Sequence, residues 1–104
     1  MIRVSVMYPN TGGKFDMDYY LNKHIPMADK LLVPFGLLRT EVDQGIGTAK
    51  PGAPAPFLVV AHLIFNSIEE MQKGFQAHDP KLAADVPNFT DIKPQFQISE
   101  ILKK

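Results

Sequence analysis

Histidines are the side chains in this sequence best suited to move a proton near neutral pH, and His24 has the most suggestive surroundings. It lies one helical turn after Tyr20 and two residues before Pro26, on the apolar side of a segment that begins near Asp16. An imidazole at the edge of a dry cavity can act as a general base, a proton shuttle or a ligand, with Tyr20 as hydrogen-bond partner. The alternative is a buried histidine whose hydrogen bond is purely structural.

His62 is the one polar residue in the otherwise apolar run Phe57–Phe65. Side chains alternate along a strand, and the larger apolar set, which begins at Phe57 and ends at Phe65, lies on the face opposite His62. We expect that larger set to face the helices, so His62 should point away from them, toward a space between two sheets. A buried imidazole needs partners there, which the neighbouring strands must supply. The polar candidates on those strands are Arg3, Ser5 and Gln97. They could line a mixed polar and apolar cavity, or His62 could simply be bonded across a dimer interface.

The sequence has few residues or motifs for other kinds of catalytic or metal site. The chain has no cysteine, which removes disulfides, thiolate metal sites and thiol nucleophiles and is typical of a reducing cytoplasm. The histidines stand far apart, with no metal-ligand spacing, and Gly45–Gly47 is a lone G-x-G without a following helix. No nucleophile elbow is present, and we expect His78, at a helix end, to cap carbonyl groups. A haem held by one histidine stays open.

Length and charge narrow the class of protein further. A chain of 104 residues predicts one domain spanning residues 1–104, and eleven basic residues balance eleven acidic ones. Zero net charge provides no field that would attract nucleic acid or an anionic membrane. No signal peptide or membrane-length apolar run is visible, so we expect a cytoplasmic protein with neither partner.

Hydrophobic periodicity predicts the elements that must hold these side chains. Strands are expected from Ile2 to the turn at Tyr8–Asn10, at Leu37–Val42 as a polar edge, at Phe57–Phe65 and at Gln95–Ile101. A long loop, Gly45–Pro56, separates the second strand from the third.

Two helical segments complete the pattern. The first begins at Asp16, must kink near Lys23–Ile25 because Pro26 lacks an N–H, and closes at Pro34 and Gly36. The second opens with the capping box Ser67–Glu70 and is expected to end at Pro80, followed by a short helical piece as far as Asp85.

The order strand, helix, strand, strand, helix, strand predicts the ferredoxin-like α+β fold, a βαββαβ arrangement with both helices on one face of a four-stranded antiparallel sheet. The third strand is central in this topology and apolar on both faces. Since no residues remain for another layer, a second copy of the chain should cover the outer face, giving a homodimeric α+β barrel.

Several segments resemble the EthD family of dimeric α+β barrel proteins. They are Tyr8–Pro9, the run Phe15–Tyr20 with its paired tyrosines, and His24–Pro26, supported by Phe65–Met71 and Asp85–Asp91. The likeness covers nearly the whole chain. It implies a ferredoxin-like homodimer and a link to ethyl tert-butyl ether degradation, in which EthD accompanies a cytochrome-type monooxygenase. It also carries His24 over as the candidate active-site residue, beside Tyr19 or Tyr20. His62 departs from the family, whose members often have an acidic residue there.

The wider superfamily includes cofactor-free monooxygenases, isomerases, cyclases and haem enzymes. We therefore expect a homodimeric enzyme that oxidises or isomerises a small, largely apolar carbonyl or enol compound without metal or nucleotide cofactor. His24 and Tyr20 would be catalytic; the substrate-binding residues would be Tyr19, His62, Arg3, Ser5 and Gln97. The alternatives are a non-catalytic small-molecule-binding or stress-related protein, and a haem protein with His24 as axial ligand.

Overall fold

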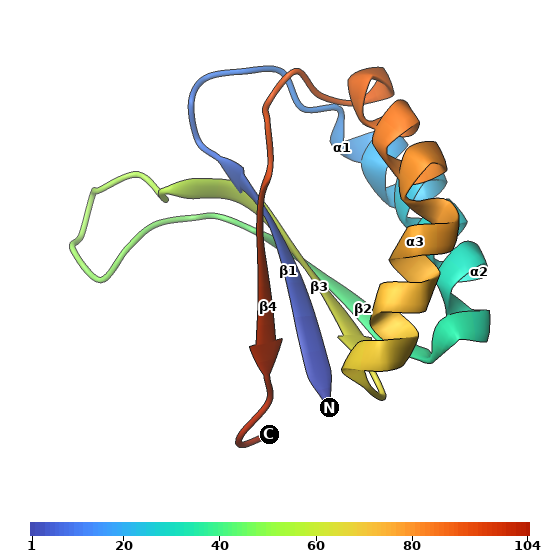
Figure 1. Ribbon diagram of the computed structural model, residues 1–104. Coiled ribbons are helices and arrows are strands. Elements are labelled where there is room, and N and C mark those ends of the chain that lie inside the picture. The colour runs from blue at the N-terminus through green and yellow to red at the C-terminus, as the bar shows by residue number, and fades with distance from the viewer.

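A computed structural model describes all 104 residues as two layers, a twisted antiparallel sheet with helices on one face only (Figure 1). The sheet has four strands in the order β2-β3-β1-β4, which confirms the predicted ferredoxin-like topology and the edge position of the second strand. The strands are β1 (Ile2–Pro9), β2 (Leu37–Gln44), β3 (Phe57–Phe65) and β4 (Gln95–Glu100).

The first helical layer is one continuous run of four segments. They are α1 (Met17–Tyr19), the π-helical turn η1 (Tyr20–His24), α2 (Ile25–Leu32) and the 3₁₀ turn η2 (Val33–Phe35). Asp16 caps the start, since its carboxylate accepts from the Tyr19 N–H at 3.0 Å. The predicted disturbance before Pro26 takes the form of the wider π turn, in which the Ile25 N–H donates to the Tyr20 carbonyl. Such turns are rare and often lie at functional sites.

The second helix, α3 (Ile68–Asp85), shows that the expected break at Pro80 is wrong. The helix continues through Pro80 and is followed by the 3₁₀ turn η3 (Val86–Asn88). Because Pro80 has no N–H, the carbonyl of Gln76 loses its partner in the helix. Both residues are exposed, so water can satisfy that carbonyl. Buried Leu82 beyond the proline keeps the last turn packed on the sheet.

Strand register divides the side chains of the sheet between two faces. The pairs Val4↔Leu63 and Val6↔Ala61 face the helices and belong to the core, whereas the neighbouring pair Ser5↔His62 points the other way. No element of the chain covers this second face, which we call the open face (Figure 1). The prediction that His62 points away from the helices is therefore confirmed by the register.

The predicted loop between β2 and β3 extends as an arm beyond the open face (Figure 1). Its base is fixed by Asn10, whose backbone N–H donates to the Pro56 carbonyl and whose side-chain amide donates to the Ala55 carbonyl, both at 3.0 Å. No helix of the chain has the length and apolar content that crossing a membrane requires.

Gly74 is where α3 comes closest to the first helical layer. A Cβ at this position would lie 2.9 Å from the Cβ of Phe35 and 3.1 Å from the Leu32 side chain. Gly74→Ala improves helix propensity by about 1 kcal/mol, but we expect the overlap to outweigh this gain and to lower the free energy of unfolding by about 1 kcal/mol or more. Urea denaturation measures the difference.

The matched control for this substitution is Gln76→Ala on the exposed side of the same helix. It should change stability by no more than about 0.5 kcal/mol. A Gly74→Ala protein more stable than the wild type would show that the two helices separate without cost.

Candidate functional site

An apolar cavity of about 310 Å³ lies between the helices and the inner face of the sheet. We call it the inner pocket. Its volume is at the lower end of the range typical of ligand sites. Small residues from different elements, Ala28 of α2 and Ala61 of β3, line its wall and leave space that a larger core side chain would fill. The polar side chains that line it are Tyr8, Tyr20, His24, Asp79 and Lys93.

His24 lies on the π turn with 8% of its surface exposed and lines the inner pocket. Its Nδ1 is 2.8 Å from Oδ2 of Asp85, and because an ionised carboxylate only accepts, Nδ1 must carry the proton. Nε2 has no hydrogen-bond partner within the chain. The imidazole packs against two aromatic rings, with centroid distances of 5.6 Å to Tyr20 and 4.7 Å to Phe89. The ring is thus fixed in orientation and tautomer.

Asp85 collects hydrogen bonds from three side chains. Besides His24, the Tyr19 hydroxyl donates to it at 2.7 Å and the Asn88 amide at 2.9 Å. Partial burial raises the pKa of Asp85, but these hydrogen bonds outweigh that effect and hold the pKa below its usual value. Conversely, the bond to this carboxylate raises the pKa of Tyr19. Asp85 is therefore an anion at neutral pH and an orienting group for His24.

Tyr8 and Tyr20 bring two phenols to the wall of the pocket. Burial raises the pKa of Tyr8 to about 12, and burial together with the neighbouring Tyr8 raises the pKa of Tyr20 still further. Both groups therefore stay protonated at physiological pH and are able to donate hydrogen bonds. A negative charge that develops on a bound molecule would be stabilised by such donors.

Sequence reasoning missed Asp85 and Tyr8 as site residues. Asp85 is 61 positions from His24, and the expected break at Pro80 detached it from the helix that carries it. Tyr8 was interpreted only as part of a turn, although it continues the inward alternation of Val4 and Val6. That alternation was the signal that could have revealed it.

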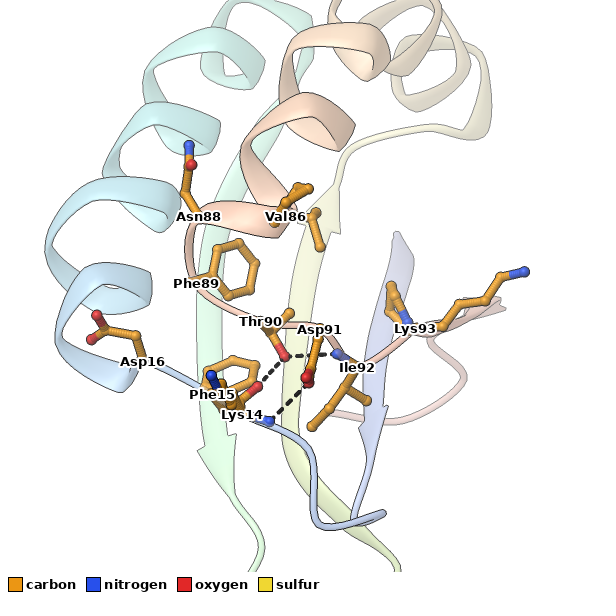
Figure 2. A pocket seen from close by; sticks show the side chains of 12 residues that line it. Lys14, Phe15, Asp16, Val86, Asn88, Phe89, Thr90, Asp91, Ile92 and Lys93 are labelled. Atoms are coloured by element: carbon orange, nitrogen blue, oxygen red, sulfur yellow. Dashed lines mark hydrogen bonds between the residues drawn. The ribbon is translucent and has the colours of Figure 1, made fainter.

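A second, more open hollow of about 900 Å³ lies between residues 14–16 and 86–94 (Figure 2). Its polar groups bond one another: the Lys14 N–H donates to Asp91 at 2.8 Å, and the Thr90 hydroxyl donates to the Lys14 carbonyl. Phe89 packs there against the rings of Phe15, Tyr8 and Tyr20. These contacts tie the start of the first helix to the segment after α3 and so hold Asp85 beside His24.

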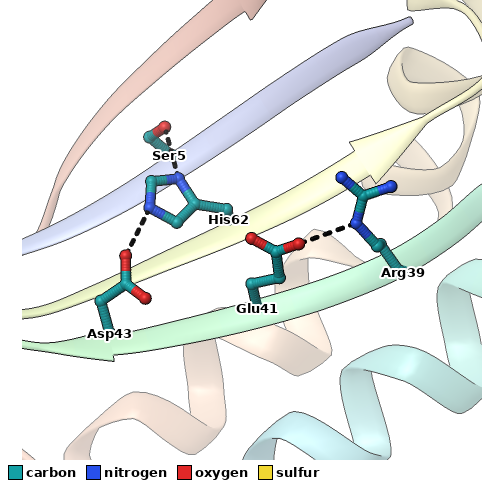
Figure 3. Close-up of polar contacts among 5 residues, drawn as sticks. All are labelled: Ser5, Arg39, Glu41, Asp43 and His62. Carbon is teal, nitrogen blue, oxygen red and sulfur yellow. Dashed lines mark hydrogen bonds and ion pairs between the residues drawn. The ribbon is translucent and has the colours of Figure 1, made fainter. Parts of the chain in front are cut away.

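His62 does not line the inner pocket, so the structure does not bring it together with His24. Its Nδ1 is 3.3 Å from the Ser5 hydroxyl and its Nε2 is 3.0 Å from Asp43 on the open face (Figure 3). Ser5 was an expected partner; Asp43 was not. Ser5, His62 and Asp43 thus form a chain of hydrogen bonds with the residue types of a catalytic triad. The serine, however, lies within a strand whose backbone N–H groups pair with neighbouring strands, which leaves no oxyanion hole.

The remaining predicted binding residues follow the same division. Arg3 is on the open face in register with Ser99, and Gln97 pairs with Ser5. Of the predicted site residues, the helix side holds Tyr19, Tyr20 and His24, and the open face holds Arg3, Ser5, His62 and Gln97. No group of three side chains has the geometry to hold a metal ion.

The sequence profile of the EthD domain matches residues 9–93. This chain belongs to the EthD family. An EthD-like protein from Ralstonia eutropha JMP134 has a similar structure, with a TM-score of 0.93 and 35% identity over 99% of this chain and 93% of that one. No match was found among curated protein sequences.

Two more distant structures show how widely the fold is shared. An EthD family protein from Bacillus halodurans C-125 gives a TM-score of 0.70 at 18% identity, covering 98% of this chain and 99% of its own. A protein described as dimeric and ferredoxin-like, from an uncultured marine organism, gives 0.57 at 14% identity, covering 100% and 97%. At these identities the likeness concerns the fold alone.

The hydrogen bonds to Asp85 predict a pH-dependent contribution to stability. A carboxyl group with a lowered folded-state pKa stabilises the protein above its unfolded pKa of about 3.9 and loses that effect as the pH falls through the folded value. Asp85→Asn should therefore lower the free energy of unfolding at pH 7, by about 1–3 kcal/mol, and the gap to wild type should shrink below pH 4.

Urea titrations from pH 3 to pH 7 measure this gap. Asp79→Asn, at an exposed position of the same helix without an ion-pair partner, should show no such trend. A gap for Asp85→Asn that is constant with pH would mean that its charge is not what the three donors stabilise.

Proposed function

We propose that the inner pocket binds a compact, largely apolar carbonyl or enol compound and that His24 moves a proton on it. The observation that carries this proposal is the His24–Asp85 hydrogen bond, which leaves Nε2 without a partner in a residue that lines an apolar cavity. A histidine oriented by a carboxylate is a common arrangement for general acid–base catalysis. The cavity equals the liquid volume of about ten waters, which favours a substrate of roughly ten non-hydrogen atoms.

In the proposed reaction, Nε2 of His24 removes the proton next to the substrate carbonyl. The imidazolium is stabilised by Asp85, and the enolate oxygen accepts hydrogen bonds from Tyr20 and Tyr8, which are neutral donors at physiological pH. Return of the proton to a different carbon completes an isomerisation. Oxidation of the same anion, the other reaction that the family resemblance suggests, requires dioxygen as the electron acceptor.

The proposal assigns the residues of the two faces different tasks. Tyr19 supports Asp85 through its hydroxyl and so acts on His24 indirectly. The open-face residues, which were first considered for substrate binding, are assigned instead to contact with a second copy of the chain. They are Arg3, Ser5, His62 and Gln97.

A homodimer of this single domain, residues 1–104, is part of the proposal. Its support is the open face, where the partly exposed Met7 and Val60 lie beside the polar group at His62. An apolar sheet face of this kind is typically covered in a stable protein. A cytoplasmic location fits the absence of cysteine and completes the proposal.

The second candidate function is a non-catalytic small-molecule-binding protein. It is favoured by the apolar wall of the inner pocket, which suits simple sequestration of a hydrophobic compound. Haem was the third expectation. A cavity of about 310 Å³ is too small to enclose a porphyrin, so the inner pocket does not fit that group.

Deuterium exchange tests proton transfer without knowledge of the natural substrate. A panel of small cyclic ketones and 1,3-diketones is incubated with the protein in D₂O, and loss of the α-proton signal is followed by NMR. Wild-type protein should accelerate exchange for at least one compound, and His24→Ala should lower that acceleration by roughly 10²–10⁴-fold because the base is removed.

His78→Ala is the matched control, since this histidine lies on α3 against Phe35, outside the inner pocket. It should leave exchange unchanged. Equal exchange by wild type and His24→Ala would remove His24 from the reaction. Compounds that shift pocket resonances but never exchange would favour the binding protein instead.

A further inference from the structure

The inner pocket is closed toward the middle of the sheet and open toward its edge. Its floor includes one row of paired residues across three strands, which is Ala61 of β3, Val6 of β1 and Phe96 of β4. Ala61 is fully buried, Val6 is half-buried, and Phe96 on the edge strand is 66% exposed. The pocket is therefore deepest over β3 and opens to solvent over β4.

The next row of the sheet repeats this gradient. Leu63 of β3 and Val4 of β1 are buried, whereas Ile98 of β4, which pairs with Val4, is 52% exposed. Phe96 and Ile98 are two positions apart on one strand, so their side chains lie on the same face, toward the helices. We call these two residues the edge strip. It begins inside the cavity wall at Phe96 and continues beyond it at Ile98.

The polar groups of the inner pocket are also divided by depth. The proposed proton-transfer group, His24, and the two phenols of Tyr8 and Tyr20 are buried. Asp79 and Lys93, which complete the polar lining, are exposed and mark the mouth. A carbonyl compound that reaches the buried groups must enter with its carbonyl end first. The rest of the molecule then points toward the mouth.

We propose that the substrate carries an unbranched alkyl chain, which leaves the inner pocket and lies on the edge strip while the carbonyl end is held at His24. This inference rests on the proposed function and adds the substrate class, which is alkyl ketones or alkyl-substituted ring ketones longer than the cavity. Phe96 and Ile98 are the residues that determine specificity for the length of the chain.

The edge strip suits an alkyl chain in its length, width and chemistry. Two positions on a strand span about 7 Å, which is the length of about five methylene groups. The strip is one side chain wide because β4 is the last strand of the sheet. It bears no charged group, and it is continuous with the cavity. The proposed homodimer uses the opposite face of the sheet, so it leaves the strip free for a ligand.

A homologous series of 2-alkylcyclopentanones tests this proposal by isothermal titration calorimetry. The butyl compound has about ten non-hydrogen atoms, which fill the cavity, so longer chains must extend beyond it. Complete burial of a methylene strengthens binding about fourfold; a chain on the strip is covered on one side, so we expect about twofold for each methylene. The octyl compound should thus bind about tenfold more tightly than the butyl compound.

Ile98→Ser and Phe96→Ser remove the two halves of the strip, and circular dichroism establishes that each variant folds. Each should lower the ratio of octyl to butyl affinity by about threefold or more, because less of the longer chain is covered. Leu38→Ser is the matched control, since Leu38 is 50% exposed on the other edge strand, β2, and outside the cavity. It should leave the ratio unchanged.

Other results overturn the proposal in distinguishable ways. If no compound of the series binds or exchanges its α-proton, the proposed function fails as well. If the short compounds bind but affinity stops rising at butyl, the chain does not lie on the strip and the proposed function stands. An equal loss in Leu38→Ser means non-specific adsorption of the chain. Variants that weaken self-association in sedimentation velocity, with an unchanged affinity ratio, mean that a second copy covers the strip.

Discussion

The contact between Asp85 and His24 is the constraint on which the rest of this structure depends. The two residues come from opposite helices and meet at 2.8 Å only because three local features coincide. The π turn before Pro26 directs His24 inward, α3 continues through Pro80 to reach Asp85, and the aromatic cluster around Phe89 holds the following segment. Together these features give a histidine with one tautomer and one orientation.

The two faces of the sheet carry two separate groups of polar side chains. Its inner face, with Tyr8 and Ala61, forms a wall of the pocket in which the oriented imidazole lies. Its open face carries His62 with Ser5 and Asp43 in a polar chain that has no path to the pocket, since adjacent residues of a strand point to opposite sides. Two histidines that looked alike in sequence thus have different surroundings and, in our proposal, different functions.

The fold could be predicted because its determinants are local and periodic. The order of strands and helices along the chain predicted the strand order, and the two-residue period of the strands predicted which face His62 shares. The partner of His24 could not be predicted, because a pairing over 61 positions leaves no periodic trace. Pro80 misled for a specific reason: water can satisfy the carbonyl that this proline frees because Gln76 is exposed, and exposure is a tertiary property.

The central claim is that Asp85 fixes His24 with its proton on Nδ1 and leaves Nε2 without a partner in the chain. Long-range ¹H–¹⁵N correlation of the histidine rings at neutral pH tests this directly, because the two nitrogens differ in shift when only one is protonated. We expect a proton on Nδ1 of His24, which is the less common site for a single ring proton in solution. A His24 ring protonated on Nε2 alone would contradict the account, since its Nδ1 would then have no proton to donate to Asp85.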